Sequence, residues 1–402
     1  MKKRVALVLA GGAARGAYEV GVVEYVLQDV ARALGRPLKF DILCGTSVGA
    51  LNACGLAAYA HLGNDSVRQM RDVWHALKLD DLVRTDVRSM LSMGSRLLGR
   101  MGSGEVPARE GGLLDPTGLE RLVGKAIPFD LIGSNLEEGH IDAVTVSTTH
   151  VQSGKTVVFV QRRERGLPAW SADPTIEPRA VSIRVEHALA SAAIPILFRS
   201  VLIDGEFHCD GGLRQNVPLS PARRLGADAV LVINPRYVPT TPLDEGDDEV
   251  ENELPGPLFL LGKTLNALLL DRIDTDLARL ESVNKILEAG TKAYGPDFVT
   301  KLNTAMGHKP GKGLRPMKAM LVRSSQNIGM LASEFVRKSK ISSHGLTGRL
   351  IRRLAAEGAQ NESDLLSYLL FEGTFAKELI DLGREDARAR HDELCEFFEE
   401  LR

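Results

Sequence analysis

Cysteine is scarce in this chain, and its few copies are not paired. The 402 residues include four cysteines, namely Cys44, Cys54, Cys209 and Cys395. No two of them form a C-x-x-C motif, the spacing that is typical of zinc sites and redox pairs. We therefore expect reduced thiols, no disulfide framework and no metal site.

A strong net charge and a long apolar run are also missing. The formal net charge is −2 at pH 7, which gives no reason to expect a nucleic-acid partner. No stretch reaches the roughly 18 apolar residues that a membrane-spanning helix needs. The basic start and the apolar residues 5–10 imitate a signal peptide, but the run is short and breaks at Gly11 and Gly12. We expect a first strand there and a cytoplasmic protein, with peripheral membrane contact as an open alternative.

Strand and helix patterns alternate in the N-terminal part. Apolar runs at residues 5–9, 40–44 and 227–233 predict buried strands, and residues 17–34 and 48–62 predict helices. Such alternation predicts a mainly parallel sheet with helices on both faces, an α/β fold. Residues 141–147 and 156–160 predict a hairpin that turns at 152–154, and residues 201–209 predict another at Asp204-Gly205. Residues 317–322 predict a late strand.

Ser47 lies in the sequence Gly45-Thr46-Ser47-Val48-Gly49, between a predicted strand and a predicted helix. This layout is typical of a nucleophile elbow, in which a tight turn exposes a serine hydroxyl. The helix N-terminus presents backbone N–H groups to a developing oxyanion. Ser47 is therefore the candidate nucleophile, supported by Gly45 and Gly49.

A second turn of small residues follows the first predicted strand. It contains Gly11, Gly12, Ala13, Ala14, Arg15 and Gly16. Its backbone N–H groups point beyond the carboxyl end of the strand, where sites form in open parallel sheets. Dinucleotide binding is disfavoured, because the spacing is not G-x-G-x-x-G. We expect an oxyanion-binding loop.

Asp210, followed by Gly211 and Gly212, is the candidate base for Ser47. A carboxylate on a glycine turn can approach another turn closely, although Asp-Gly also occurs in ordinary turns. His187 and His208 do not lie in a triad context. We favour a serine–aspartate dyad, with His208 as a structural or rim residue.

These motifs together resemble the patatin-like phospholipases. The loop at residues 11–16, the elbow around Ser47, the segment at residues 190–198 and the Asp210-Gly211-Gly212 turn occur in the order of that family. The resemblance covers about residues 5–235. It implies a three-layer α/β/α fold, a Ser47–Asp210 dyad, an acyl-enzyme, a lipid or phospholipid substrate and no cofactor. Ala13 departs from the glycine of the family's loop, and we expect its N–H to remain a donor only if its φ is negative.

The resemblance predicts a catalytic domain at residues 1–238, an acidic linker at 239–255 and a mainly helical region at 256–402. Residues 84–112 mix apolar residues with arginines and predict a mobile lid, a surface that contacts lipid, or a core-packing helix with solvated arginines. Residues 337–353 are basic and predict a solvated helical face or a site for anionic lipid. The oligomeric state stays open. Two alternatives to hydrolysis also stay open: a catalytically silent lipid-binding scaffold, and an acyltransferase that uses the same dyad.

Overall fold

A computed structural model of the chain describes residues 3–79, 114–164, 166–168, 170, 173–238, 273–308, 313–338 and 364–401. The predicted segment at 84–112 and the predicted linker at 239–255 lie outside these residues. So do the apolar run at 258–270 and all but the first two residues of the basic stretch at 337–353. The predicted domain boundaries therefore stay predictions.

The described part contains one nine-stranded, mainly parallel sheet. Its path runs β5-β4-β3-β2-β1-β8-β9, with the β6–β7 hairpin attached to β3. Strands β3, β2, β1, β8 and β9 are mutually parallel, whereas β4 and β7 are antiparallel to β3. The strands are β1 (Val5–Leu9), β2 (Ile42–Thr46), β3 (Ala143–His150), β4 (Thr156–Arg162), β5 (Ile176–Ala180), β6 (Val201–Ile203), β7 (Glu206–Asp210), β8 (Ala229–Asn234) and β9 (Lys318–Arg323).

Each strand that the sequence predicts is present, with small shifts in its bounds. The second strand begins at Ile42 and not at residue 40. Asp41, the residue before this strand, bonds to Val5 in two ways. The Asp41 amide donates to the Val5 carbonyl, and the Asp41 carboxylate accepts from the Val5 amide. The side-chain bond stands in place of a strand-to-strand backbone bond, so that the strand begins after Asp41, at Ile42. The strand β5 is absent from the prediction.

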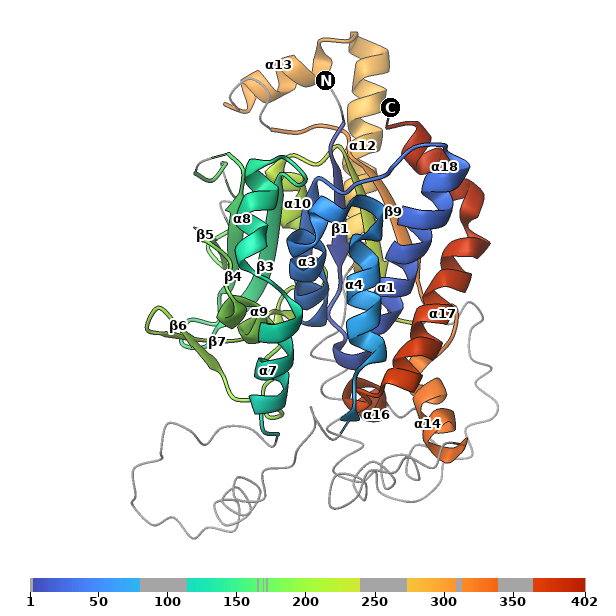
Figure 1. Ribbon diagram of the computed structural model, residues 1–402. Helices are drawn as coiled ribbons and strands as arrows, with labels where there is room; N and C mark the ends of the chain where they lie inside the picture. The colour runs from blue at the N-terminus through green and yellow to red at the C-terminus, as the bar shows by residue number, and fades with distance from the viewer. Residues whose placement is uncertain are drawn as a thin grey trace, which may run out of the picture.

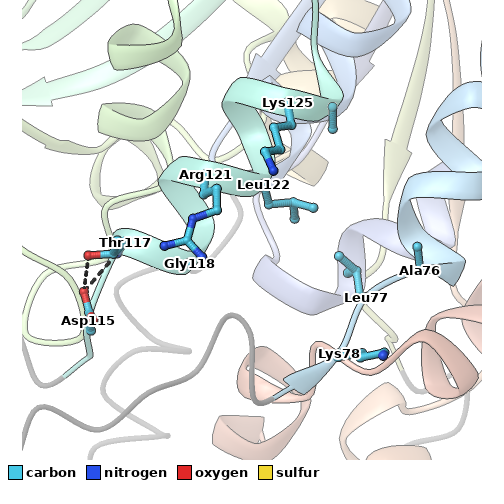
Figure 2. A pocket seen from close by; sticks show the side chains of 10 residues that line it. Ala76, Leu77, Lys78, Asp115, Thr117, Gly118, Arg121, Leu122 and Lys125 are labelled. Atoms are coloured by element: carbon cyan, nitrogen blue, oxygen red, sulfur yellow. Dashed lines mark hydrogen bonds between the residues drawn. The ribbon is translucent and has the colours of Figure 1, made fainter.

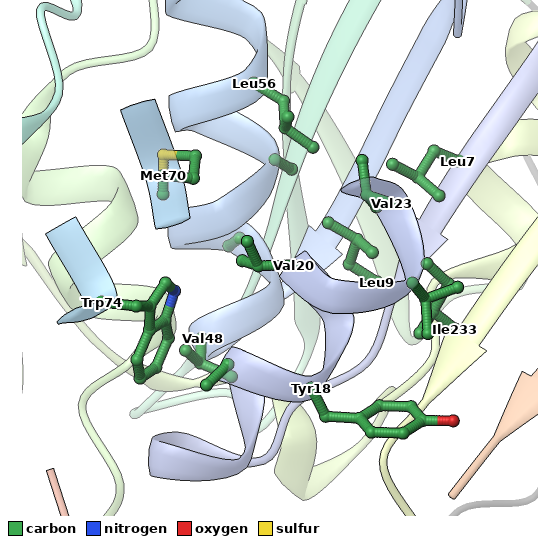
Figure 3. Close-up of a cluster of buried hydrophobic side chains, with 14 of the residues drawn as sticks. Leu7, Leu9, Tyr18, Val20, Val23, Val48, Leu56, Met70, Trp74 and Ile233 are labelled. Carbon is green, nitrogen blue, oxygen red and sulfur yellow. The ribbon is translucent and has the colours of Figure 1, made fainter. Parts of the chain in front are cut away.

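Helices cover both faces of the sheet, which gives the three layers of an α/β/α fold (Figure 1). The alternation along β1 shows this directly: Leu7 and Leu9 face one hydrophobic core, and Ala6 and Val8 face the other. The larger core packs the sheet against α1 (Gly16–Tyr25), α3 (Val48–Ala58), α4 (Ser66–His75) and α17 (Gly373–Ala389). Figure 3 shows part of this core around Tyr18 and Trp74. The smaller core packs the sheet against α10 (Leu219–Leu225) and α12 (Ile273–Tyr294).

The helices follow the predicted positions closely in the N-terminal half. The expected helix at 17–34 is α1 continued by a π turn and α2, and the expected helix at 48–62 is α3 followed by a 3₁₀ turn. The helices are α1 (Gly16–Tyr25), α2 (Ala31–Ala33), α3 (Val48–Ala58), α4 (Ser66–His75), α7 (Thr117–Ala126), α8 (Asp130–Glu137), α9 (Val185–Ser191), α10 (Leu219–Leu225), α12 (Ile273–Tyr294), α13 (Phe298–Ala305), α14 (Ile328–Lys338), α16 (Asp364–Leu369), α17 (Gly373–Ala389) and α18 (His391–Glu399). The shorter turns are η1 (Ala13–Arg15), η2 (Val26–Val30), η3 (Ala60–Asp65) and η4 (Gly211–Leu213).

The C-terminal elements share the sheet and core of the N-terminal part. Strand β9 pairs with β8, and α17 lies along α1 (Figure 1). Two glycines permit this close helix packing: a Cβ on Gly21 would lie 2.0 Å from the Ile380 carbonyl oxygen, and one on Gly383 would lie 2.2 Å from that of Tyr18. Within the described residues, no helix is both long and apolar enough to cross a membrane.

Candidate active site

Ser47 occupies a strained turn between β2 and α3. Its φ of 55° and ψ of −129° lie in a backbone region that residues other than glycine rarely adopt. The glycines on either side allow the chain to fold so tightly. A Cβ on Gly45 would lie 2.2 Å from the Gly49 carbonyl oxygen, and one on Gly49 would lie 2.4 Å from that of Leu9. The turn thereby directs the Ser47 side chain away from its own strand and helix.

Asp210, the last residue of β7, accepts a hydrogen bond from Ser47. The Ser47 hydroxyl donates to Asp210 Oδ2 at 2.6 Å. The other carboxylate oxygen, Oδ1, accepts from the Gly212 amide at 2.7 Å. Gly211 permits this approach, because a Cβ there would lie 2.3 Å from the Ser147 carbonyl oxygen. The two candidate catalytic residues are thus in direct contact, 163 residues apart in the chain.

Burial makes Asp210 a base suited to neutral pH. Its side chain is completely buried. Burial raises the pKa of Asp210 to about 7, although the hydrogen bonds from Ser47 and Gly212 oppose the shift. A general base is most effective when its pKa lies near the working pH. The geometry and the electrostatics therefore both suit proton abstraction from Ser47.

Gly11 brings the small-residue loop against Ser47 but does not offer its own N–H. That group donates to the Asn216 carbonyl oxygen at 3.1 Å. A Cβ on Gly11 would lie 3.0 Å from the Ser47 Cβ and 2.2 Å from Asn216 Oδ1. Of the four N–H groups at residues 11–14, those of Gly12, Ala13 and Ala14 have no acceptor in the described part of the chain. These three remain candidate oxyanion donors.

Ala13 has a positive φ, the conformation in which we expected its N–H to fail as an oxyanion donor. Its φ is 48°, in the left-handed region, and not negative. This conformation costs an alanine about 1 kcal/mol. In the described residues the Ala13 N–H has no acceptor. The expectation that a positive φ removes this donor stays a prediction.

Arg15 is directed to the C-terminal helices and not to Ser47. Its Nε donates to the Ser367 hydroxyl at 2.9 Å, and its guanidinium lies 4.3 Å from the centre of the Tyr368 ring. Gly16 begins α1 in close contact with the elbow, because a Cβ there would lie 2.5 Å from a methyl group of Val48. Arg15 therefore holds the loop in place through α16.

Ser191 is a site residue that the sequence did not single out. Its hydroxyl accepts from the Ser47 amide at 2.8 Å and donates to the Ser147 carbonyl at 2.6 Å. Nearby, the Ala193 carbonyl accepts from the Asp210 amide at 2.9 Å. The segment at residues 190–198 thus fixes the backbone of both Ser47 and Asp210. The only signal in the sequence was the match of this segment to the family pattern.

The histidines near the site serve packing. His208 is fully buried in β7, and its Nδ1 lies 3.0 Å from the Thr148 hydroxyl. Burial lowers the pKa of His208 to about 4, so its ring is neutral. His187 accepts from the Arg184 amide at the start of α9 and packs edge-on against Phe159. In the described residues, neither ring bonds to Ser47 or Asp210.

A cavity of about 390 Å³ opens between the end of α4 and helix α7 (Figure 2). Its walls combine apolar Leu77 and Leu122 with cationic Lys78, Arg121 and Lys125. The start of α7 is tied to the segment at 190–198, because the Leu114 amide donates to the Leu197 carbonyl. The cavity therefore borders the elements that support Ser47.

Comparison with known proteins agrees with this geometry. The family model described as patatin-like phospholipase matches residues 7–223, more than half of the chain. This chain belongs to the patatin-like phospholipase family. The match includes the loop at 11–16, Ser47, Ser191 and Asp210. The fold and family predicted from the sequence are confirmed.

One curated relative is a cGAMP-activated phospholipase from Pseudomonas aeruginosa, which is 28% identical over 220 residues. The match spans 53% of this chain and 53% of the relative. Among solved structures, VipD from Legionella pneumophila matches 95% of this chain and 67% of its own, at 11% identity and a TM-score of 0.28. Human GIVD cytosolic phospholipase A2, in complex with methyl gamma-linolenyl fluorophosphonate, matches 99% and 59%, at 11% identity and a TM-score of 0.39. Those scores are low, and the assignment depends on the family match.

Proposed function

We propose that this chain is a lipid acyl hydrolase of the phospholipase A type, with Ser47 as nucleophile and Asp210 as base. The observation that carries the proposal is the 2.6 Å bond from the Ser47 hydroxyl to a buried carboxylate whose pKa is raised to about 7. Asp210 accepts the Ser47 proton as the serine oxygen attacks an acyl ester carbonyl. The ester C–O bond then breaks, the protonated Asp210 returns its proton to the alcohol oxygen, the alcohol leaves, and an acyl-enzyme forms.

The small-residue loop supplies the electrostatic stabilisation in this mechanism. The N–H groups of Gly12, Ala13 and Ala14 face the developing oxyanion, and removal of one such donor typically costs about 3 kcal/mol. Asp210 then activates a water molecule that releases the fatty acid. No metal or organic cofactor takes part in these steps.

The cavity beside α7 suits a phospholipid in particular. Leu77 and Leu122 offer apolar surface to an acyl chain, and Arg121 and Lys125 offer positive charge to a headgroup phosphate. A phospholipid carries both features in one molecule. We propose that this cavity receives part of the substrate.

We also propose peripheral membrane contact through the β6–β7 hairpin. Leu202 and Phe207 are directly opposite each other in register, and the Val151 amide donates to the Phe207 carbonyl. All three residues are exposed: Leu202 by 55%, Phe207 by 40% and Val151 by 47%. Such a row of exposed apolar side chains suits a lipid surface. Together with the free cysteines, it supports a cytoplasmic protein that docks on membranes.

The test is release of fatty acid from phospholipid vesicles by wild type, Ser47→Ala and Asp210→Asn. Both variants should lose nearly all turnover while they keep the wild-type circular dichroism spectrum. Wild-type activity in either variant contradicts the dyad. A fluorophosphonate probe separates the alternatives: folded wild-type protein that stays unlabelled favours a silent scaffold. Added glycerol or lysolipid that captures the acyl group favours a transferase.

A further inference from the structure

A second cavity, of about 350 Å³, is lined by five arginines. They are Arg4, Arg162, Arg223, Arg224 and Arg315, and Trp170 lies beside them. Arg4 precedes β1, whereas Ser47 and the loop at 11–16 follow the carboxyl ends of β2 and β1. The chain enters β1 near the end of the molecule that carries the N-terminus, and α7 and α16 lie at the other end (Figure 1). The arginine pocket is therefore separate from the Ser47 site.

Three of the five guanidinium groups have no acceptor in the described part of the chain. Arg162 pairs with Glu164, and Arg315 donates to the Ala227 carbonyl at 2.8 Å and lies 3.7 Å from Asp228. The side chains of Arg4, Arg223 and Arg224 make no such bond within the described residues. A concave site lined by charges of one sign raises the local concentration of ions of the opposite sign, here anions.

The arginines also crowd one another. A Cβ on Gly226, which ends α10, would lie 2.1 Å from Arg4 Nη2 and 3.4 Å from Arg315 Nη2. Two cationic groups therefore pack over the same glycine. Burial lowers the pKa of Arg315 and of Arg224. Asp228 opposes the shift at Arg315, whereas the neighbouring arginines Arg4 and Arg223 add to the shifts of Arg315 and Arg224, respectively. A bound anion would relieve this repulsion.

Two buried N–H groups near the pocket lack a partner. Arg224 Nε and the Trp170 indole N–H are each shielded from solvent and bond to nothing in the described residues. An unsatisfied buried donor is costly, typically by about 1–3 kcal/mol, and such groups commonly mark a missing ligand, ion or water. Both donors suit an oxygen-rich ligand.

We propose that the arginine pocket binds a small molecule that carries a phosphate group. Arginine forks match phosphate oxygens in geometry and charge. The volume suits a ligand of nucleotide size, because small-molecule pockets measure roughly 300–1,000 Å³. Trp170 offers a flat apolar surface next to the charged groups. The ligand binds at a distance from Ser47 and is not the acyl substrate.

Isothermal titration calorimetry of the full chain with inorganic phosphate, AMP and glycerol 3-phosphate tests the proposal. At least one ligand should bind saturably, and Arg223→Gln and Arg224→Gln should each weaken that binding about tenfold. Arg279→Gln is the control, because Arg279 is exposed on α12, pairs with Asp276 and lies outside the pocket. Ser47→Ala should bind as wild type does, so that this result is independent of the proposed hydrolase.

Arg223 is exposed, so that its replacement leaves the fold intact, and thermal melting checks each variant. If AMP binds more tightly than phosphate, the base contributes beside Trp170; if glycerol 3-phosphate binds most tightly, a lipid headgroup is the source. Either order supports the pocket, provided that at least one of the two arginine variants weakens binding. Absence of saturable binding by all three ligands overturns the proposal, as does wild-type affinity in both arginine variants.

Discussion

Replacement of Asp210 by asparagine should stabilise the folded protein at neutral and alkaline pH. The carboxylate is completely buried, and its two recorded hydrogen bonds come from the Ser47 hydroxyl and the Gly212 amide. Asparagine has nearly the same shape, and its oxygen can accept from Gly212. Its amino group can donate to the Ser47 oxygen, but the Ser47 hydroxyl then loses the acceptor of its own proton. The variant therefore removes the buried charge at the cost of one hydrogen bond, about 1 kcal/mol.

The magnitude follows from the pKa of Asp210. Burial raises it from 3.8 to about 7. Each unit corresponds to 1.36 kcal/mol, so that the ionised carboxylate costs about 4 kcal/mol of unfolding free energy. Because the folded-state pKa lies above the unfolded one, the cost is absent below about pH 4. It grows as the pH rises towards 7 and is constant beyond that value. Asparagine does not titrate and avoids this cost.

Melting temperatures measured from pH 4 to pH 8.5 by differential scanning fluorimetry test this reasoning. Between pH 4 and pH 8 the melting temperature of the variant should rise by about 5 °C relative to that of wild type, given the entropy of unfolding expected for a chain of this length. Asp173→Asn is the matched control, because Asp173 is an exposed carboxylate with a lowered pKa. Parallel curves for Asp210→Asn and wild type would refute the assignment of a strongly raised pKa to Asp210.

Three further substitutions test the backbone of the site. Ser191→Ala removes the hydroxyl that accepts from the Ser47 amide and donates to the Ser147 carbonyl. We expect the free energy of unfolding to fall by about 1–3 kcal/mol and the esterase activity to fall at least tenfold. Ser282→Ala, at an exposed serine, is the control. Gly211→Ala should inactivate the enzyme, because the added Cβ would clash with the Ser147 carbonyl oxygen and displace Asp210. Gly124→Ala is the control: its Cβ would meet open space in α7, so that activity should stay unchanged and the melting temperature should stay unchanged or rise slightly. Ala13→Gly should retain or increase the rate of fluorophosphonate labelling, because glycine relieves the strain at φ = 48°, and a large loss would contradict that account.

The local parts of the fold could be predicted from the sequence because their signals are local. The elbow and the β6–β7 hairpin each contain a strand pattern next to a turn of small residues. Strand β5 gave no such signal. Its sequence IEPRA contains a proline and two charged residues, and no residue in it is fully buried. Proline is tolerated at a sheet edge, where its missing N–H costs nothing, and β5 is the edge strand next to β4.

The candidate site was predictable in part, because Ser47 and Asp210 lie on recognisable turns and the residues that support them do not. The two glycines that follow Asp210 mark it as a residue on a tight turn, and its pairing with Ser47 was predicted from that turn and supported by the family resemblance. Ser191 is an ordinary serine near the end of a helix, and its contact with Ser47 spans 144 residues. The bond from the Gly11 amide to Asn216 likewise depends on a loop 205 residues away, which no local pattern reveals.

The least predictable feature is the attachment of the small-residue loop to the C-terminal helices. Arg15 contacts Ser367 and Tyr368 across about 350 residues of chain. Gly21 and Gly383 allow α17 to pack tightly on α1, the helix that begins directly after the loop. Asn216 anchors the loop on one side and α16 on the other, so that its candidate oxyanion donors are held in place without substrate. The electrostatic catalysis that we propose requires such preorganisation. In that proposal the C-terminal helices support the site, although every proposed reacting group lies in the N-terminal half of the sequence or just beyond it.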